Sequence, residues 1–262
     1  MDTIEISTDG PIGRLTLARP DSLNPLSTRC LEELAEAARW FDDQAEVRVV
    51  IVAGQGRAFC AGADLAGFTA PGPPDVRPRD ANDAGRLMVE AIERMRPVTI
   101  ATVHGHCVGG GVLLAVACDL RIAAAGTRFS IPEVDLGIPL AWGGIPRLVR
   151  EIGPALTKEL VLTCRPFDAT EAREIGLVNR VVREDRLAAE VDALAAELAA
   201  KSAFTSERTL EAVDAAAEAM IPTDGAVDDA DLFVAALADP ESREVGAAYL
   251  ERHMADRVDR GR

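Results

Sequence analysis

The segment "VRVVIVAGQGRAFCAGADL", residues 47–65, joins a strongly apolar run to a stretch of small residues. The apolar run predicts a strand over Val47–Val52 that is buried on both faces, as in a parallel sheet. The side chains of Ala61, Gly62 and Ala63 are too small to cover the main chain, so their N–H groups stay open to a ligand. The segment therefore predicts an α/β fold with a backbone-lined site at the end of a strand.

A second segment of this kind, "VHGHCVGGGVLLAVACDL" (103–120), follows the next predicted strand, 97–105. Its glycine triplet, Gly109–Gly111, opens an apolar helix predicted over 110–118. The first N–H groups of a helix have no partner within it, and glycine leaves them accessible. Two such donors on one oxygen form an oxyanion hole. The alternative is that both glycine sites are ordinary turns, the commonest use of glycine after a strand.

Composition narrows the class of protein. The 262 residues include 43 acidic and 28 basic side chains, a net charge of −15, so we expect neither nucleic acid nor membrane as a partner. Five cysteines stand singly and no histidine shows ligand spacing with them, so we expect reduced thiols and no metal. The sequence shows no signal-peptide pattern and no transmembrane run, which predicts a soluble cytoplasmic protein. Motifs for dinucleotide, ATP and serine-hydrolase sites are absent.

The pattern of elements changes along the chain. Strands and helices alternate at first, with a helix near 82–95 preceded by a proline- and glycine-rich stretch, 67–80, that predicts a mobile loop. Helical patterns dominate toward the C-terminus. We therefore divide the chain into an α/β core, residues 1–190, and a helical region, residues 191–262, of a kind that often serves oligomer assembly.

Three blocks together resemble the crotonase superfamily of enoyl-CoA hydratases and isomerases. They are "GRAFCAGADL" (56–65), "VHGHCVGGGVLLAVACDLRIAA" (103–124) and "RFSIPEVDLGIPLAWGGIPRLVREIG" (128–153). The resemblance covers about residues 3–260 and implies a crotonase-like spiral of β-β-α turns, with C-terminal helices that assemble homotrimers or hexamers. It implies an acyl-CoA substrate and no separate cofactor, because coenzyme A is part of the substrate. Members of the superfamily share the fold but differ in reaction.

The same resemblance implies the residues of the site. The N–H groups of Ala63 and Gly110 are expected to bind the thioester oxygen, and Glu133 is expected to transfer the proton. Coenzyme A is expected to run past residues 22–26 and 61–65, with the acyl group in the pocket beyond. The residues implied to bind substrate are Ser22, Leu23, Asn24, Ala61, Gly62, Asp64, Leu65, Gly109, Leu113, Pro132, Leu140 and Trp142.

Leu113 departs from the pattern of the hydratases, which carry a glutamate at this position and a second one at the position of Glu133. Hydration uses such carboxylates to position and activate a water, and leucine performs neither task. Moving a double bond needs one base and no water, so we predict a Δ3,Δ2-type enoyl-CoA isomerase with Glu133 as its sole acid and base. Burial is expected to raise the pKa of that carboxyl group. Ala141 replaces the aspartate of dienoyl-CoA isomerases, which argues against their reaction.

Other interpretations stay open at this point. They are a hydratase that works with one glutamate, a non-catalytic acyl-CoA-binding protein, and another superfamily reaction such as decarboxylation or thioester hydrolysis. Asp135 points the same way as Glu133 if the chain between them is extended. We expect structural roles for Asp64, Asp119, His104 and His106, a pocket-lining role for Trp142 and Phe68, and a phosphate contact for Arg252 or Arg257.

Overall fold

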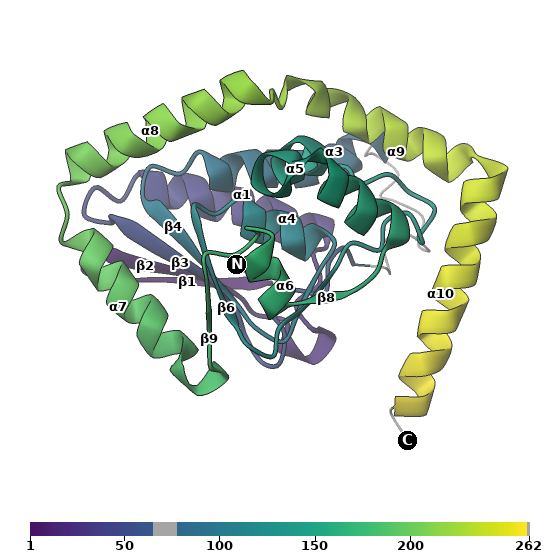
Figure 1. Cartoon of the computed structure of the whole chain (residues 1–262), viewed down its shortest axis with the longest axis horizontal. Helices are drawn as coiled ribbons and strands as arrows, with labels where there is room; N and C mark the ends of the chain where they lie inside the picture. The colour runs from purple at the N-terminus through teal and green to yellow at the C-terminus, as the bar shows by residue number, and fades with distance from the viewer. Residues whose placement is uncertain (65–77, 261–262) are drawn as a thin grey trace.

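The computed structural model describes residues 1–64 and 78–260 (Figure 1). Leu65, Phe68 and the predicted loop up to residue 77 lie outside the described residues. Helix α3 spans Pro78–Glu93, so the last residues assigned to that loop are helical and the helix begins earlier than predicted. Proline is accepted in the first turn of a helix because the N–H group it lacks has no helical partner there.

The main sheet has the order β1-β2-β3-β4-β6-β9. Its first two strands form an antiparallel hairpin, and the remaining pairs are parallel. A smaller sheet has the order β5-β7-β8. The strands are β1 Ile4–Asp9, β2 Ile12–Leu17, β3 Val49–Gly54, β4 Val98–Val103, β5 His106–Val108, β6 Leu120–Ala124, β7 Arg128–Ser130, β8 Phe167–Asp168 and β9 Arg180–Val182.

The apolar sequence of strand β3 is explained by its burial on both faces, because alternate side chains enter two different cores. Val50 and Val52 join the core formed with α1 (Thr28–Asp42) and α3, whereas Val49 and Ile51 join the core beneath α7 (Leu187–Ala199). Figure 1 shows α7 on the opposite side of the sheet from α1 and α3. The prediction of a strand buried on both faces is confirmed, as is the α/β class.

The C-terminal part is helical, as expected. Helix α8 (Ala203–Met220) spans the top of the core in Figure 1, and α9 (Asp229–Ala238) and α10 (Pro240–Arg260) follow it. The division at residue 190 falls inside α7, which packs on the sheet, so the domain boundary stays a prediction. Within the described ranges, no helix has the length and apolar character needed to cross a membrane.

Three further helices complete the core. Helix α4 (Gly110–Val116) begins at the glycine triplet, α5 (Gly144–Thr163) begins within the third sequence block, and α6 (Ala169–Glu174) leads to the last strand. The cysteines are buried and none is part of a disulfide, as predicted from their single placement.

Candidate active site

Two backbone segments expected to border coenzyme A, 22–26 and 61–64, lie side by side. The Leu26 N–H group donates to the Gly62 carbonyl at 2.8 Å, and the Asp64 N–H group donates to the Leu26 carbonyl at 3.0 Å. These bonds form a short parallel bridge between stretches that are far apart in the sequence. The pairing holds the small-residue loop 61–64 against residues 22–26, in the region where the sequence predicts a ligand.

The N–H groups of Ala63 and Gly110 fit the predicted donor pair. Within the described part of the chain, neither group donates a hydrogen bond. Their segments are neighbours, since a Cβ atom added to Gly62 would lie 3.8 Å from the Gly110 nitrogen and 2.7 Å from the Val108 carbonyl oxygen. Gly62 has a φ of +87°, so both its conformation and the close backbone require glycine. Two N–H groups without a partner among the described residues, on neighbouring segments, are the kind of donors that an oxyanion hole requires.

Glu133 lies next to this pair of donors. Its Oε1 occupies the space where a side chain of Gly109 would begin, and any Cβ atom there would overlap it. Gly109 also has a φ of +49°, and its N–H group donates to the Ser130 carbonyl at 2.9 Å, so the turn into α4 is tied to the end of β7. The fold therefore brings the predicted acid/base residue against the glycine triplet.

The carboxyl group of Glu133 is poorly solvated. Its Oε2 is buried and has no hydrogen-bond partner among the described residues. Burial raises the pKa of Glu133 to about 7, while its own backbone amide acts in the opposite direction. No neighbouring charge among the described residues contributes to this shift. A carboxyl group with a pKa close to neutrality is suited to both accept and return a proton.

Leu113 is 1% exposed and lies in the interior of α4. A Cβ atom on Gly144 would lie 2.8 Å from a Leu113 methyl carbon and 3.0 Å from Leu140 Cγ. The position that carries a glutamate in hydratases is therefore a closed apolar contact between α4 and the start of α5. Sequence reasoning identified the residue, and the structure shows how tightly its side chain is enclosed.

Trp142 covers the start of α4. A Cβ atom on Gly110 would lie 2.5 Å from the Trp142 ring and 3.2 Å from a Leu26 methyl carbon. The ring also occupies the side-chain space of Gly85 in α3, so it fills the gap between two helices. Trp142 has a φ of +62°, an uncommon conformation for a large residue. Leu26 lies in the segment 22–26 expected to border coenzyme A, but its contact with the triplet could not be predicted, because it depends on the bridge to the small-residue loop.

The side chain of Asn24 has a different role from the predicted substrate contact. It is 1% exposed, its amide donates to the Ala58 carbonyl at 2.8 Å, and its oxygen accepts from the Arg19 N–H group at 3.0 Å. Because these bonds occupy it, the side chain holds the loop together rather than facing a ligand. Asp64 supports the same loop through an ion pair with Arg19 at 3.0 Å. Its predicted structural role agrees with this geometry.

The remaining candidates are placed as follows. Asp135 is exposed within a turn, so the extended chain that would align it with Glu133 is not formed. His104 Nε2 lies 3.0 Å from a backbone carbonyl oxygen, and Asp119 accepts a hydrogen bond from the Thr99 N–H group at 2.6 Å, so both have local structural roles. Ser22 is exposed, and Leu23, Ala61 and Pro132 are half-buried. No cluster of potential metal ligands occurs among the described residues.

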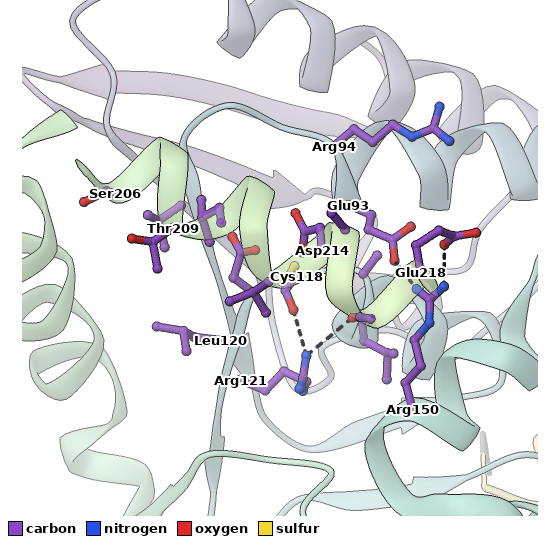
Figure 2. Close-up of a pocket in the computed structure, with 18 of the residues that line it drawn as sticks. Glu93, Arg94, Cys118, Leu120, Arg121, Arg150, Ser206, Thr209, Asp214 and Glu218 are labelled. Carbon is purple, nitrogen blue, oxygen red and sulfur yellow. Dashed lines mark hydrogen bonds and ion pairs between the residues drawn. The ribbon is translucent and has the colours of Figure 1, made fainter. Parts of the chain in front are cut away.

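A cavity of about 1030 Å³ lies elsewhere, between α8, α5 and the chain that leads into β6. Figure 2 shows Arg121 and Arg150 within it, with Arg150 facing the carboxylate of Glu218. Arg121 pairs with Glu151 at 2.5 Å, and Arg150 pairs with Glu218. None of its described lining residues belongs to the predicted site, so this cavity is a separate feature of the molecule.

Comparison with known proteins identifies the family. A model of the enoyl-CoA hydratase/isomerase family matches residues 7–259. The probable enoyl-CoA hydratase echA8 of Mycobacterium bovis is 36% identical over 252 residues, covering 96% of each chain. The peroxisomal Delta(3,5)-Delta(2,4)-dienoyl-CoA isomerase of Arabidopsis thaliana is 36% identical over 194 residues, covering 69% of each.

The fold is that of solved structures of the same kind. The crystal structure of an enoyl-CoA hydratase from Mycobacterium avium subsp. paratuberculosis K-10 superposes with a TM-score of 0.86 at 26% identity, covering 94% of this chain and 98% of that one. The crotonase-like α/β fold expected from the sequence is therefore confirmed. The expectation of an enzyme of the hydratase or isomerase type is confirmed with it. The chain belongs to the enoyl-CoA hydratase/isomerase family.

Proposed function

We propose that the protein is a Δ3,Δ2-type enoyl-CoA isomerase in which Glu133 alone moves the proton. The observation that carries this proposal is the state of that carboxyl group. It lies against Gly109, its Oε2 has no described hydrogen-bond partner, and burial raises its pKa to about 7. No second carboxylate among the described residues contributes to that shift, whereas a hydratase site of this family is expected to have one.

The reaction follows from this arrangement. The ionised carboxylate of Glu133 removes a proton from the α carbon of a 3-enoyl thioester, and the electron pair moves into a dienolate. The N–H groups of Ala63 and Gly110 donate to the thioester oxygen, where the negative charge gathers. The protonated Glu133 then returns the proton to the γ carbon, which leaves the conjugated 2-enoyl thioester and the carboxylate as it began.

The apolar neighbours support a reaction without water. Leu113 and Leu140 are 1% and 5% exposed, and they pack against the start of α5 instead of offering a polar group. Trp142 covers Gly110 from the other side. Excluding water from the dienolate favours return of the proton by Glu133 over competing reactions.

A second candidate function is hydration of a 2-enoyl-CoA. The names of the relatives favour it, because the 36% identical echA8 protein is called a probable enoyl-CoA hydratase. Such an enzyme would have to activate its water with Glu133 and without a partner at Leu113. The relative named as a dienoyl-CoA isomerase does not support a third candidate strongly, since Ala141 replaces the aspartate expected for that reaction.

The two functions separate in one assay. The purified protein is given a 3-enoyl-CoA and, separately, a 2-enoyl-CoA, and the ultraviolet band of the conjugated thioester is followed. The isomerase predicts growth of the band from the 3-enoyl substrate with little loss from the 2-enoyl one. Rapid loss from the 2-enoyl substrate identifies a hydratase and contradicts the proposal. No change in either contradicts both functions and leaves acyl-CoA binding without this chemistry, or a reaction on a different acyl group.

We also propose that the helical region assembles a homotrimer or hexamer in the cytoplasm. Helix α8 contains no buried residue, although many of its side chains are apolar. In a single chain the apolar side chains of α8 are exposed to water, and a second copy of the chain would bury them. Sedimentation of the purified protein tests the assembly. The large exposed side chains of α8 are Phe204, Val213 and Met220.

A further inference from the structure

Helix α10 contacts the turn that carries Glu133. Figure 1 shows this helix as an arm beside the core, after α9. Ser242, Gly246 and Tyr249 are spaced by four and three residues, so they lie on one face of the helix. That face meets the segment 133–138, which forms a turn closed by a hydrogen bond from the Ile138 N–H group to the Glu133 carbonyl at 3.0 Å.

Two of these contacts are between backbones. A Cβ atom on Gly246 would lie 2.6 Å from the Leu136 carbonyl oxygen, so α10 has no room for a side chain there. Conversely, the side-chain space of Gly137 is occupied by the Ser242 carbonyl oxygen. Gly137 also has a φ of +70°, so its conformation and its surroundings both require glycine. Glycine on each side thus permits the closest approach of helix and turn.

Tyr249 lies one turn beyond Gly246 on the face of α10 that meets residues 136 and 137. Ser242 lies against Gly137 and Gly246 against Leu136, so the helix proceeds along the turn toward the residues that precede Leu136. Tyr249 is half-buried. Burial is the main cause that raises the pKa of its phenol, and the negative charges of Asp135 and Glu133 raise it further, whereas Arg252 lowers it. Cys164, at the end of α5, also raises the pKa of Tyr249.

This contact matters because Glu133 has little else to hold it. Its Oε2 makes no hydrogen bond among the described residues, so the direction of the carboxyl group depends on the backbone of its turn. We propose that α10 is a positioning element for Glu133, with Gly246 and Tyr249 as its positioning residues. The effect on catalysis rests on the proposed function, whereas the docking of the helix does not.

Gly246→Ala tests the docking, since two physical effects predict opposite results. Alanine stabilises an exposed helix by about 1 kcal/mol relative to glycine, so a free α10 would gain stability. If α10 is docked, the added methyl group pushes it away from Leu136. We expect kcat to fall about 10- to 100-fold, because small displacements of a catalytic group are costly, with KM changed less than about threefold. Gly225→Ala is the matched control, because nothing lies within 4 Å of its added Cβ, and it should leave kcat unchanged.

A spectroscopic readout is independent of activity. The chain has one tyrosine, so the ultraviolet change on phenol ionisation reports Tyr249 alone. In the wild type its pKa should lie above the ordinary value of about 10, and in Gly246→Ala it should fall toward that value. As a second variant, Tyr249→Ala should lower kcat, and Tyr249→Phe, which keeps the ring, should restore most of it.

The outcomes are distinct. A Gly246→Ala protein that is more stable, with unchanged kcat and an unchanged phenol pKa, overturns the proposal. If Gly246→Ala does not fold, unchanged kcat in Tyr249→Ala overturns it instead. If the wild type does not isomerise 3-enoyl-CoA but the phenol pKa shifts as expected in Gly246→Ala, the docking of α10 stands and the proposed function fails.

Discussion

Two glutamates whose carboxyl groups are shielded from water have opposite environments. Glu33, on α1, is 2% exposed and accepts hydrogen bonds from the N–H groups of Asp2 and Thr3, the Thr3 hydroxyl group and Arg29. Burial acts to raise the pKa of Glu33, but these donors outweigh it and lower the value to about 2. Burial acts on Glu133 almost unopposed and raises its pKa to about 7.

The difference shows that hydrogen-bond donors, and not burial alone, decide what a buried carboxyl group can do. Glu33 stays ionised at neutral pH and fastens the N-terminal strand to α1, so it cannot exchange a proton with a ligand. Glu133 lies close to the midpoint of its titration and has an unsatisfied oxygen. The missing hydrogen-bond partners of Glu133 among the described residues lower the stability of the folded protein and leave its carboxyl group able to exchange a proton, a combination that is common in active sites.

The largest expected effect is on catalysis. Glu133→Gln removes the only group assigned to proton transfer while keeping its shape, so kcat for a 3-enoyl-CoA should fall about 10²- to 10⁴-fold. Exchange of the substrate α proton with deuterated water should be lost with it. Glu33→Gln is the matched control, because it makes the same chemical change at the other buried glutamate, and its kcat should stay within about twofold of the wild type. Undiminished exchange in Glu133→Gln would show that another group is the base.

A further effect concerns the stability of Glu133→Gln. The pKa of Glu133 is about 7 in the folded protein, against 4.5 for the ordinary group, so ionisation is easier in the unfolded chain. The wild type therefore loses stability as the pH rises from about 4.5 to 7. Glutamine has no charge to bury, so Glu133→Gln should be more stable than the wild type above about pH 7, by at most about 3 kcal/mol.

Denaturant unfolding at about pH 4.5 and about pH 8 measures this difference in the free energy of unfolding. At the lower pH both side chains are neutral, and the two proteins should be nearly equal in stability. A variant that is less stable than the wild type at both values would mean that Glu133 makes hydrogen bonds in solution. Its elevated pKa would then be wrong.

Much of this site could be predicted from the sequence, because its parts are local patterns. The strand before the small-residue loop and the glycine triplet each follow from a short segment, whereas Glu133 was assigned through the resemblance to the crotonase superfamily. Leu113 was identified in the same way, as an apolar residue at an expected acidic position. The predicted start of α3 was late because a proline-rich stretch suggested a loop, although proline is accepted at a helix start.

Contacts between distant segments could not be predicted in this way. The packing of Trp142 between Gly85 and Gly110 joins three separate parts of the chain. The approach of Gly246 to Leu136 likewise depends on where α10 lies after α9 ends, and no local period encodes that position. A role for Tyr249 could therefore not be predicted from the sequence, because it depends on the face of α10 that meets residues 136 and 137.

The smallest expected effect is the loss of stability in Glu33→Gln. Glutamine keeps an oxygen acceptor but loses the charge that strengthens the bonds from Thr3 and Arg29, which should cost about 1–3 kcal/mol at neutral pH. Because the pKa of Glu33 is lowered to about 2 in the folded protein, this stability is present above about 4.5, the ordinary value, and is lost as the pH falls toward 2. The gap between wild type and Glu33→Gln in denaturant unfolding should therefore be constant from about pH 6 to 8 and close below about pH 4. A gap that instead widens as the pH falls would mean that Glu33 and Glu133 do not differ in the way their hydrogen-bond donors predict.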